Sequence, residues 1–117
     1  MNHRKLVQPE YMNEQGNLFG GYLLKWLDEY AYITASIDYP GNRFVTIGLE
    51  KVEFRKPIAL GEILRFCVSE TRKGNTSLEY LVEVFGERAA ESADTALFAT
   101  KITFVNVDEE GTKQAIR

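Results

Sequence analysis

Three glycines and two acids surround one predicted helix start, and they are the residues of this sequence best suited to chemistry. Gly16, Gly20 and Gly21 lie in or beside the start of a long apolar segment. The first turn of a helix carries unsatisfied N–H groups and a partial positive charge, and glycine allows close approach to the backbone. A helix start lined with glycine can therefore hold a developing oxyanion. Glycines that only form a turn and let the helix pack would give the same pattern.

The two acids of this segment differ in their place on the predicted helix. At about 100° per residue, Glu29 lies in the middle of the polar stripe, four residues after Lys25, and is predicted to be its solvated partner. Asp28 lies at the edge of that stripe, where a carboxylate is partly desolvated and better suited to act as a base. Asp28 is therefore the candidate catalytic acid, and an edge carboxylate satisfied by a neighbour is the alternative.

The composition limits the other groups that could take part in catalysis. The chain has 117 residues, one His (His3), one Cys (Cys67) and a net charge of -3, which argues against a general nucleic-acid binder. One Cys closes no internal disulfide, and one His with one Cys builds no zinc site of the usual kind. His3 lies where chains are commonly loose, and Cys67 is predicted to be buried and inert. If the protein is an enzyme, its base is expected to be a carboxylate.

Hydrophobic periodicity predicts one long helix followed by strands. Leu18–Ile37 is apolar around nearly its whole circumference, so this helix is predicted to be enclosed, and Pro40 follows its end. A short strand is expected before the helix, at about Leu6–Gln8. After the helix, apolar residues alternate with period two. They form the predicted buried faces of three strands: Leu64, Phe66 and Val68; Leu78, Tyr80, Val82 and Val84; and Phe98, Ile102 and Phe104.

Breaks in the alternation indicate bends and turns. The apolar alternation of residues 45–49 changes parity at Val52, so a bulge is expected near Glu50–Lys51. A tight hairpin is predicted at Lys73–Thr76, with Gly74 and Asn75 at positions that tolerate positive φ. The remaining segments are predicted to be irregular: a polar connection at Arg88–Asp94 and a frayed tail at Val107–Arg117.

Together the elements predict an α+β fold in a single domain, residues 1–117. Consecutive strands joined by short turns imply an antiparallel sheet, and a curved sheet of about five strands wrapped around the helix would bury both apolar surfaces. No secretory signal is visible, and charged residues at Lys25, Asp28 and Glu29 interrupt the most apolar stretch, so no membrane span is expected. The default expectation is a soluble cytoplasmic protein.

The ordered set of motifs resembles a known family. Asn13-x-x-Gly16-x-x-Phe19-Gly20-Gly21, followed by Leu24 and Asp28-Glu29, resembles the hotdog-fold acyl-CoA thioesterases of the YciA and brain acyl-CoA hydrolase type. Further matches are Val45-Thr46, Phe54-x-x-Pro57 with Gly61, and Arg72-x-Gly74-x-x-Ser77. The resemblance covers roughly Val7 to Val107, and the family's architecture of a sheet around a helix agrees with the one predicted from periodicity.

The resemblance implies hydrolysis of acyl-CoA to a free carboxylic acid and CoA. In such enzymes the helix acid, matched by Asp28, activates water or attacks the carbonyl directly, and the loop Asn, matched by Asn13, positions the water or the carbonyl. The glycine matched by Gly21 offers its N–H to the oxyanion, and Thr46 matches a polar residue near the site. The family's sites lie at a homodimer interface, so Asn13 and Asp28 of one site would come from different subunits.

The resemblance also implies a set of contacts to the substrate. The expected substrate and CoA contacts are Gly20, Thr46, Arg55, Arg72, Lys73, Gly74 and Ser77. No metal and no cofactor are expected, because CoA is part of the substrate and the product. The family often assembles its dimers further into trimers of dimers, and no nucleic-acid or membrane partner is expected. Neither the acyl chain length nor the choice between base and nucleophile for Asp28 follows from the sequence.

Two other functions fit the same fold. A hotdog-fold acyl-CoA sensor would keep the CoA groove without catalysis, and the presence of both Asp28 and Asn13 argues against it. A hotdog dehydratase or hydratase would need a histidine near the acid, and His3 lies ahead of the first predicted strand.

Overall fold

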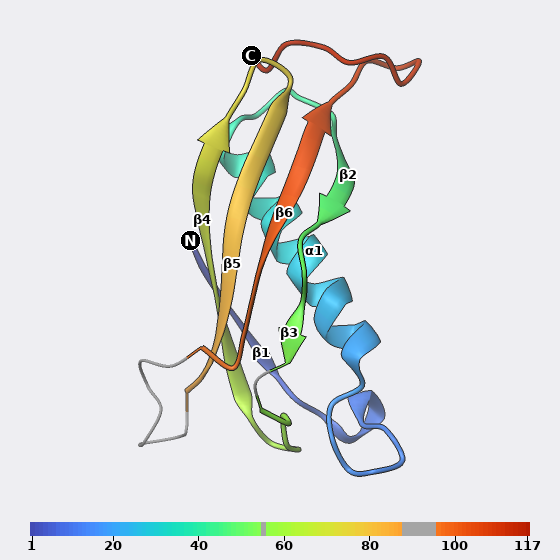
Figure 1. The fold of residues 1–117 in the computed structure, drawn as a ribbon, viewed down its shortest axis with the longest axis vertical. Helices are drawn as coiled ribbons and strands as arrows, with labels where there is room; N and C mark the ends of the chain where they lie inside the picture. Colours follow the sequence, from blue (N-terminus) through green and yellow to red (C-terminus); the bar gives the residue numbers. More distant parts are fainter. Residues whose placement is uncertain (55, 88–95) are drawn as a thin grey trace.

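The chain folds as one long helix against a six-stranded antiparallel sheet (Figure 1). The structure is a computed structural model and describes residues 1–54, 56–87 and 96–117. The elements in chain order are β1 (Asn2–Leu6), the 3-10 helix η1 (Pro9–Tyr11), α1 (Gly20–Asp38), β2 (Phe44–Leu49), β3 (Glu53–Phe54), β4 (Ile63–Lys73), β5 (Ser77–Gly86) and β6 (Phe98–Asn106).

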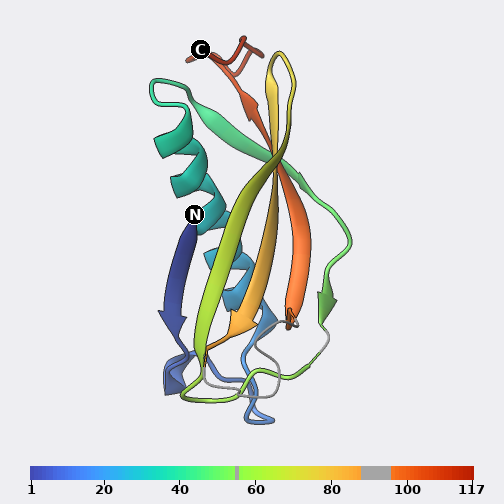
Figure 2. The ribbon, with the colours of Figure 1, turned by 90° about the vertical axis from the view of Figure 1, so that its left-hand side faces the viewer.

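The sheet has two free edges, and α1 lies along one of its faces (Figure 2). The strand order is β1-β4-β5-β6-β2, with the short β3 pairing with β6. The predicted buried faces of β4, β5 and β6 are confirmed, since all ten of the apolar residues assigned to them are at most 2% exposed. Those faces pack on Leu23, Leu27 and Ala31 of α1, which are fully buried.

The helix begins later than predicted and is enclosed on one side only. Leu18 precedes α1 because its N–H donates to the carbonyl of Ile58 at 2.8 Å, which holds it in a loop. Tyr32 and Ile37 are 46% and 60% exposed, although the wheel predicts that they are enclosed. A single chain therefore leaves part of the apolar circumference of the helix uncovered.

The first two strands differ from their predicted positions. β1 occupies Asn2–Leu6 and pairs with β4, whereas the sequence predicts the strand at about Leu6–Gln8; Gln8 keeps an extended backbone but caps η1, which begins at Pro9. The irregularity in the β2–β6 register lies between Thr46 and Gly48, where a glycine weakens the strand, and not near residue 50. The change in parity at Val52 reflects the break between the separate strands β2 and β3.

The β4–β5 hairpin forms where predicted, but its glycine has a different role. Neither Gly74 nor Asn75 has a positive φ, and the positive values among the described residues are at Gly16, Gly41, Gly61 and Gly111. A Cβ at Gly74 would lie 2.8 Å from Oγ of Ser77, so a larger residue here would displace that side chain. The predicted polar connection at Arg88–Asp94 lies outside the described residues.

The C-terminal segment is tied to the fold, which corrects the prediction of a frayed tail. Asn106 is 1% exposed, and its side chain accepts the N–H of Arg43 and donates to the carbonyl of Ala115. The N–H of Ile116 donates to the carbonyl of Asn75 at 2.9 Å. The polar composition of the tail does not predict this anchoring, because most of the tail's hydrogen bonds are made by its backbone.

Candidate active site

Asp28 contacts the edge strand β2 from the middle of α1. Its side chain is half-buried, and Oδ1 accepts a hydrogen bond from Oγ1 of Thr46 at 2.6 Å. The hydrogen bonds and ion pairs of the described residues leave Oδ2 of Asp28 without a partner. The structure thus places Asp28 at the border of the buried face, as predicted, with one oxygen fixed and the other able to accept a proton.

The start of α1 has no side-chain cap. Phe19 occupies the N-cap position, and its own N–H donates to the carbonyl of Tyr11 at 2.9 Å. A Cβ at Gly20 would lie 3.2 Å from the ring of Phe54, and a Cβ at Gly21 would lie 2.7 Å from the ring of Phe19. The two glycines therefore leave space for two aromatic rings that flank the helix start. The first N–H groups of a helix have no intrahelical acceptor, so this end can donate to an anion.

Asn13 forms the loop that leads to α1. Its Oδ1 accepts the N–H groups of Gln15 at 2.9 Å and Asn17 at 3.0 Å, and Gly16 takes a φ of 81° within the loop. These bonds identify Asn13 as a turn-forming residue, as its type alone indicates. They also orient the side chain, and Nδ2 makes no hydrogen bond within the described part of the chain.

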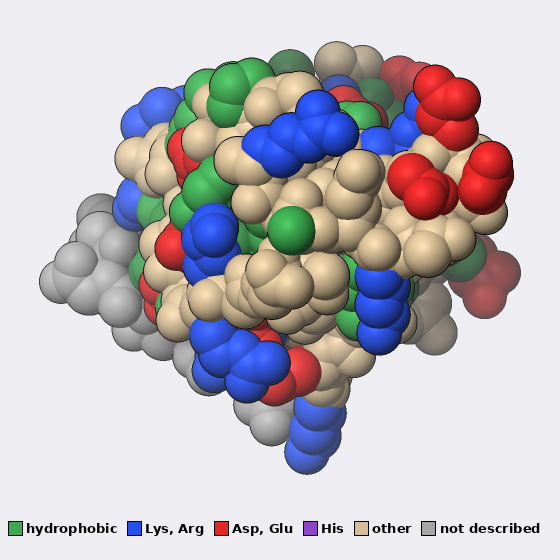
Figure 3. All heavy atoms as spheres, turned by 90° about the horizontal axis from the view of Figure 1, so that it is seen from above, with side chains coloured by type: hydrophobic (Ala, Val, Ile, Leu, Met, Phe, Trp, Pro, Cys, Tyr) green, Lys and Arg blue, Asp and Glu red, His purple; other side chains and the backbone are tan. Residues whose placement is uncertain are grey.

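Four of the residues expected to bind CoA lie at the end of the chain away from the helix start. Arg72, Lys73, Gly74 and Ser77 belong to the β4–β5 hairpin, whereas α1 begins at the opposite end of the long axis (Figure 1). Figure 3 views the hairpin end from above and shows Lys and Arg side chains spread over it, with the largest group of acidic side chains on one side and others along the opposite edge. One chain therefore does not bring these residues to the helix start, and Arg55 lies outside the described residues.

His3 is ordered within β1, although the sequence predicts a loose position. Its ring stacks on Tyr30 with centroids 4.7 Å apart, and Nε2 lies 3.1 Å from Oγ1 of Thr34. Desolvation lowers the pKa of His3. Because β1 and β2 are opposite edges of the sheet, His3 contacts α1 from the side away from Thr46, so it is not part of the Asp28 site of its own chain.

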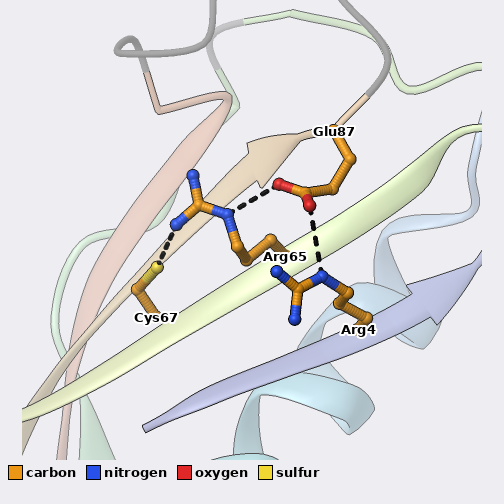
Figure 4. Close-up of polar contacts among 4 residues, drawn as sticks. All are labelled: Arg4, Arg65, Cys67 and Glu87. Atoms are coloured by element: carbon orange, nitrogen blue, oxygen red, sulfur yellow. Dashed lines mark hydrogen bonds and ion pairs between the residues drawn. The ribbon is translucent and has the colours of Figure 1, made fainter.

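A polar cluster on β1, β4 and the end of β5 is not predicted from the sequence (Figure 4). Glu87 accepts from Nε of Arg65 at 2.7 Å and from Nε of Arg4 at 3.1 Å, and these bonds lower its pKa. Nη1 of Arg65 lies 2.9 Å from Sγ of Cys67, which is half-buried rather than buried. Alternation along β4 puts Arg65 and Cys67 on one face, but only the sheet order places Arg4 and Glu87 beside them.

Neither a membrane span nor a metal site is found in the described residues. No helix there is long and apolar enough to cross a membrane. Within the same ranges, no group of three or more His, Cys, Asp or Glu side chains is placed to hold a metal ion.

Comparison with known proteins identifies the family. The family model of the thioesterase superfamily matches residues 15–93. The acyl-CoA thioester hydrolase YciA of Escherichia coli K12 is 32% identical over 116 residues, which cover 97% of this chain and 87% of the relative. The chain therefore belongs to the thioesterase superfamily, and the resemblance drawn from its motifs is confirmed.

Solved structures confirm the predicted fold. A hexameric hotdog-fold thioesterase of Campylobacter jejuni superposes with a TM-score of 0.83 at 30% identity, covering 98% of this chain and 88% of that one. An acyl-CoA hydrolase of Staphylococcus aureus in complex with butyryl coenzyme A and coenzyme A gives a TM-score of 0.84 at 31% identity, covering 99% and 68%. Structures of that hydrolase, 28% identical to this chain, include variants in which an aspartate, a threonine or an asparagine is changed to alanine. This chain has the hotdog fold.

Proposed function

We propose that the protein hydrolyses acyl-CoA thioesters to a carboxylic acid and CoA, with Asp28 as the base or nucleophile. The observation that carries the proposal is the Asp28 carboxylate, which Thr46 holds at 2.6 Å through one oxygen and whose other oxygen has no partner among the described residues. The named activities of the relatives support it. The Staphylococcus aureus variants concern the same three residue types as Asp28, Thr46 and Asn13.

The chemistry requires little beyond these groups. A thioester is already activated, so one base, one water and one oxyanion donor suffice. Asp28 takes a proton from water, whose oxygen attacks the carbonyl carbon, or its carboxylate attacks that carbon and water then cleaves the anhydride. The oxyanion accepts a hydrogen bond from the N–H of Gly21. The C–S bond then breaks and releases the CoA thiolate. The amide Nδ2 of Asn13 holds the carbonyl or the water.

The proposed oxyanion donor and the Asp28 carboxylate of one chain lie well apart along α1. Asp28 follows Gly21 by seven residues on α1, which separates them by about 10 Å along the axis at 1.5 Å per residue. This backbone separation is longer than the single contact of about 3–3.5 Å that reacting atoms need, which favours a site shared between subunits. The helix start of one subunit and the Asp28 of another would therefore form each site.

The free edge of β2 is suited to hold the second subunit. Val45, Ile47 and Leu49 are 41%, 60% and 41% exposed, which is unusual for apolar residues of a regular strand with an unpaired edge. A second copy that pairs antiparallel with β2 about a two-fold axis would cover them and reach Thr46 and Asp28. We propose such a homodimer, assembled further into a trimer of dimers, as the hexameric relatives suggest.

The same two-fold axis accounts for the distant CoA residues. Antiparallel pairing of β2 reverses the long axis of the second subunit, so its β4–β5 hairpin points toward the helix start of the first. Arg72 and Lys73 are exposed on this hairpin and carry the charge that phosphates of CoA would meet. The proposed CoA contacts are Gly20, Thr46, Arg55, Arg72, Lys73, Gly74 and Ser77.

Thiol release from acyl-CoAs tests the proposed function directly. The wild-type protein should release free thiol, and Asp28→Asn should lower kcat by about 10²–10⁴, the usual contribution of a general base. Glu29→Gln is the matched control, because Glu29 is the next acid on α1 and is exposed. Wild-type turnover by Asp28→Asn would refute the mechanism. Binding of acyl-CoA without thiol release by the wild type would favour a sensor instead.

A further inference from the structure

A pocket of about 240 Å³ adjoins the start of α1. It is lined by Asn17, Leu18, Leu23, Phe54, Lys56, Pro57 and Ile58. The ring of Phe54 forms its border with the helix, because Cζ lies 3.2 Å from the place of a Cβ on Gly20. The pocket thus begins beside Gly20, the residue that precedes Gly21, to which the oxyanion is assigned.

The inner wall of this pocket is apolar and held in place, and Asn17 and Lys56 add polar groups to its lining. Leu18, Leu23 and Ile58 are each at most 9% exposed, and the bond from the N–H of Leu18 to the carbonyl of Ile58 joins two of them. Phe54 is 57% exposed and is supported from one side by the ring of Phe98, at a centroid distance of 5.2 Å. Phe54 therefore forms the outer wall of the pocket, and its substitution leaves the buried core residues in place.

A second pocket on the helix start has a different lining. It measures about 230 Å³ and is lined by Phe19, Gly21, Tyr22 and Lys25. None of these four residues is buried, whereas Leu18, Leu23 and Ile58 of the first pocket are. Transfer of methylene groups from water is favourable only where the surroundings are apolar and closed to water. Of the two pockets, the one beside Phe54 comes nearer to that condition, because three of its lining residues are buried apolar side chains.

We infer that the pocket beside Phe54 holds the acyl chain of the thioester and that Phe54 limits the chain length. The inference rests on the proposed thioesterase function. A water-sized group occupies about 30 Å³, so 240 Å³ takes roughly eight such groups. The preferred substrates are accordingly acyl-CoAs of short to medium chain length. Chains longer than the octanoyl group extend past the outer wall.

A chain-length series from butyryl-CoA to palmitoyl-CoA tests the inference. For the wild type, kcat/KM should rise by up to roughly fourfold per methylene until octanoyl-CoA and then level off or fall. Phe54→Ala should move the optimum to longer chains, and Phe54→Leu should fall between the two. Phe19→Ala, which removes an equally exposed ring on the other side of the helix start, should leave the position of the optimum unchanged. An optimum that moves with Phe19→Ala and not with Phe54→Ala would overturn the assignment.

A binding measurement separates this inference from the proposed function. Titration calorimetry with Asp28→Asn, with and without Phe54→Ala, measures the affinity for each of the same acyl-CoAs in the absence of turnover. If the plateau in affinity moves with Phe54→Ala but the wild type releases no thiol, the pocket assignment stands and the catalytic function fails. If thiol is released but neither affinity nor kcat/KM depends on Phe54, the catalytic function stands and the pocket assignment is wrong.

Discussion

A mixture of two inactive variants provides the strongest test of a site shared between subunits. In Asn13→Ala the loop amide is lost, and in Asp28→Asn the carboxylate is lost. If each site takes Asn13 from one chain and Asp28 from the other, a mixed dimer has one site with both defects and one site with neither. Random exchange at equal concentrations makes half of the dimers mixed, so total activity should return to roughly one quarter of the wild-type value.

The geometry of α1 leads to this expectation, since the helix start and Asp28 of one chain are about 10 Å apart along the axis. Thiol release after co-refolding of the two variants measures the recovered activity. Thr46→Val mixed with Asp28→Asn is the matched control: these two residues touch within one chain at 2.6 Å, so no site in that mixture has both intact. Subunit exchange is verified by mass. If the activity of the first mixture does not exceed the summed activities of the two variants alone, the shared site is refuted.

Three further predictions concern positioning, packing and charge. Thr46→Val should lower kcat by roughly 10–100-fold, because a carboxylate displaced by about 1 Å can cost 10² in rate; Thr46→Ser keeps the hydroxyl and should retain most activity in the same thiol assay. Leu27→Ala should lower the free energy of unfolding by about 2–5 kcal/mol in denaturant titration, because this side chain is fully buried; near wild-type stability would contradict the packing. Arg65 and then Arg4 hold the pKa of Glu87 below its usual 4.5, so its contribution to stability is present above that pH and is lost as the pH falls through the lowered value. The stability of Glu87→Gln should therefore fall less than that of the wild type as the pH is lowered. Identical stability-against-pH profiles for the two proteins would show that Glu87 makes no such contribution.

Periodicity was sufficient to predict the layers of the fold. The alternation through Leu78, Tyr80, Val82 and Val84 assigns every one of them to the buried face, and the structure agrees. The helical wheel likewise places Asp28 at the border of the apolar face, where the structure shows it half-buried. These predictions succeed because they depend only on geometry within one element.

Features that depend on two distant elements were not predictable in the same way. The bond between Thr46 and Asp28 joins an edge strand to a helix, and nothing in the local pattern of either predicts their contact. The anchoring of the tail depends on buried Asn106, whose polar type indicates a loop when it is taken alone. The pocket beside Phe54 needs the loop before α1 and the segment after β3 to meet, and only the folded chain shows this.

The anchored tail makes the proposed CoA-binding hairpin part of a larger cooperative unit. Ile116 and Asn106 donate their N–H groups to the carbonyls of Asn75 and Thr76, both in the turn between β4 and β5. A local opening of this turn must therefore break bonds to two other segments, which raises its free energy above that of an isolated hairpin tip. If this turn binds the nucleotide end of CoA as proposed, less ordering entropy is lost on binding, because the turn is already ordered in the free protein.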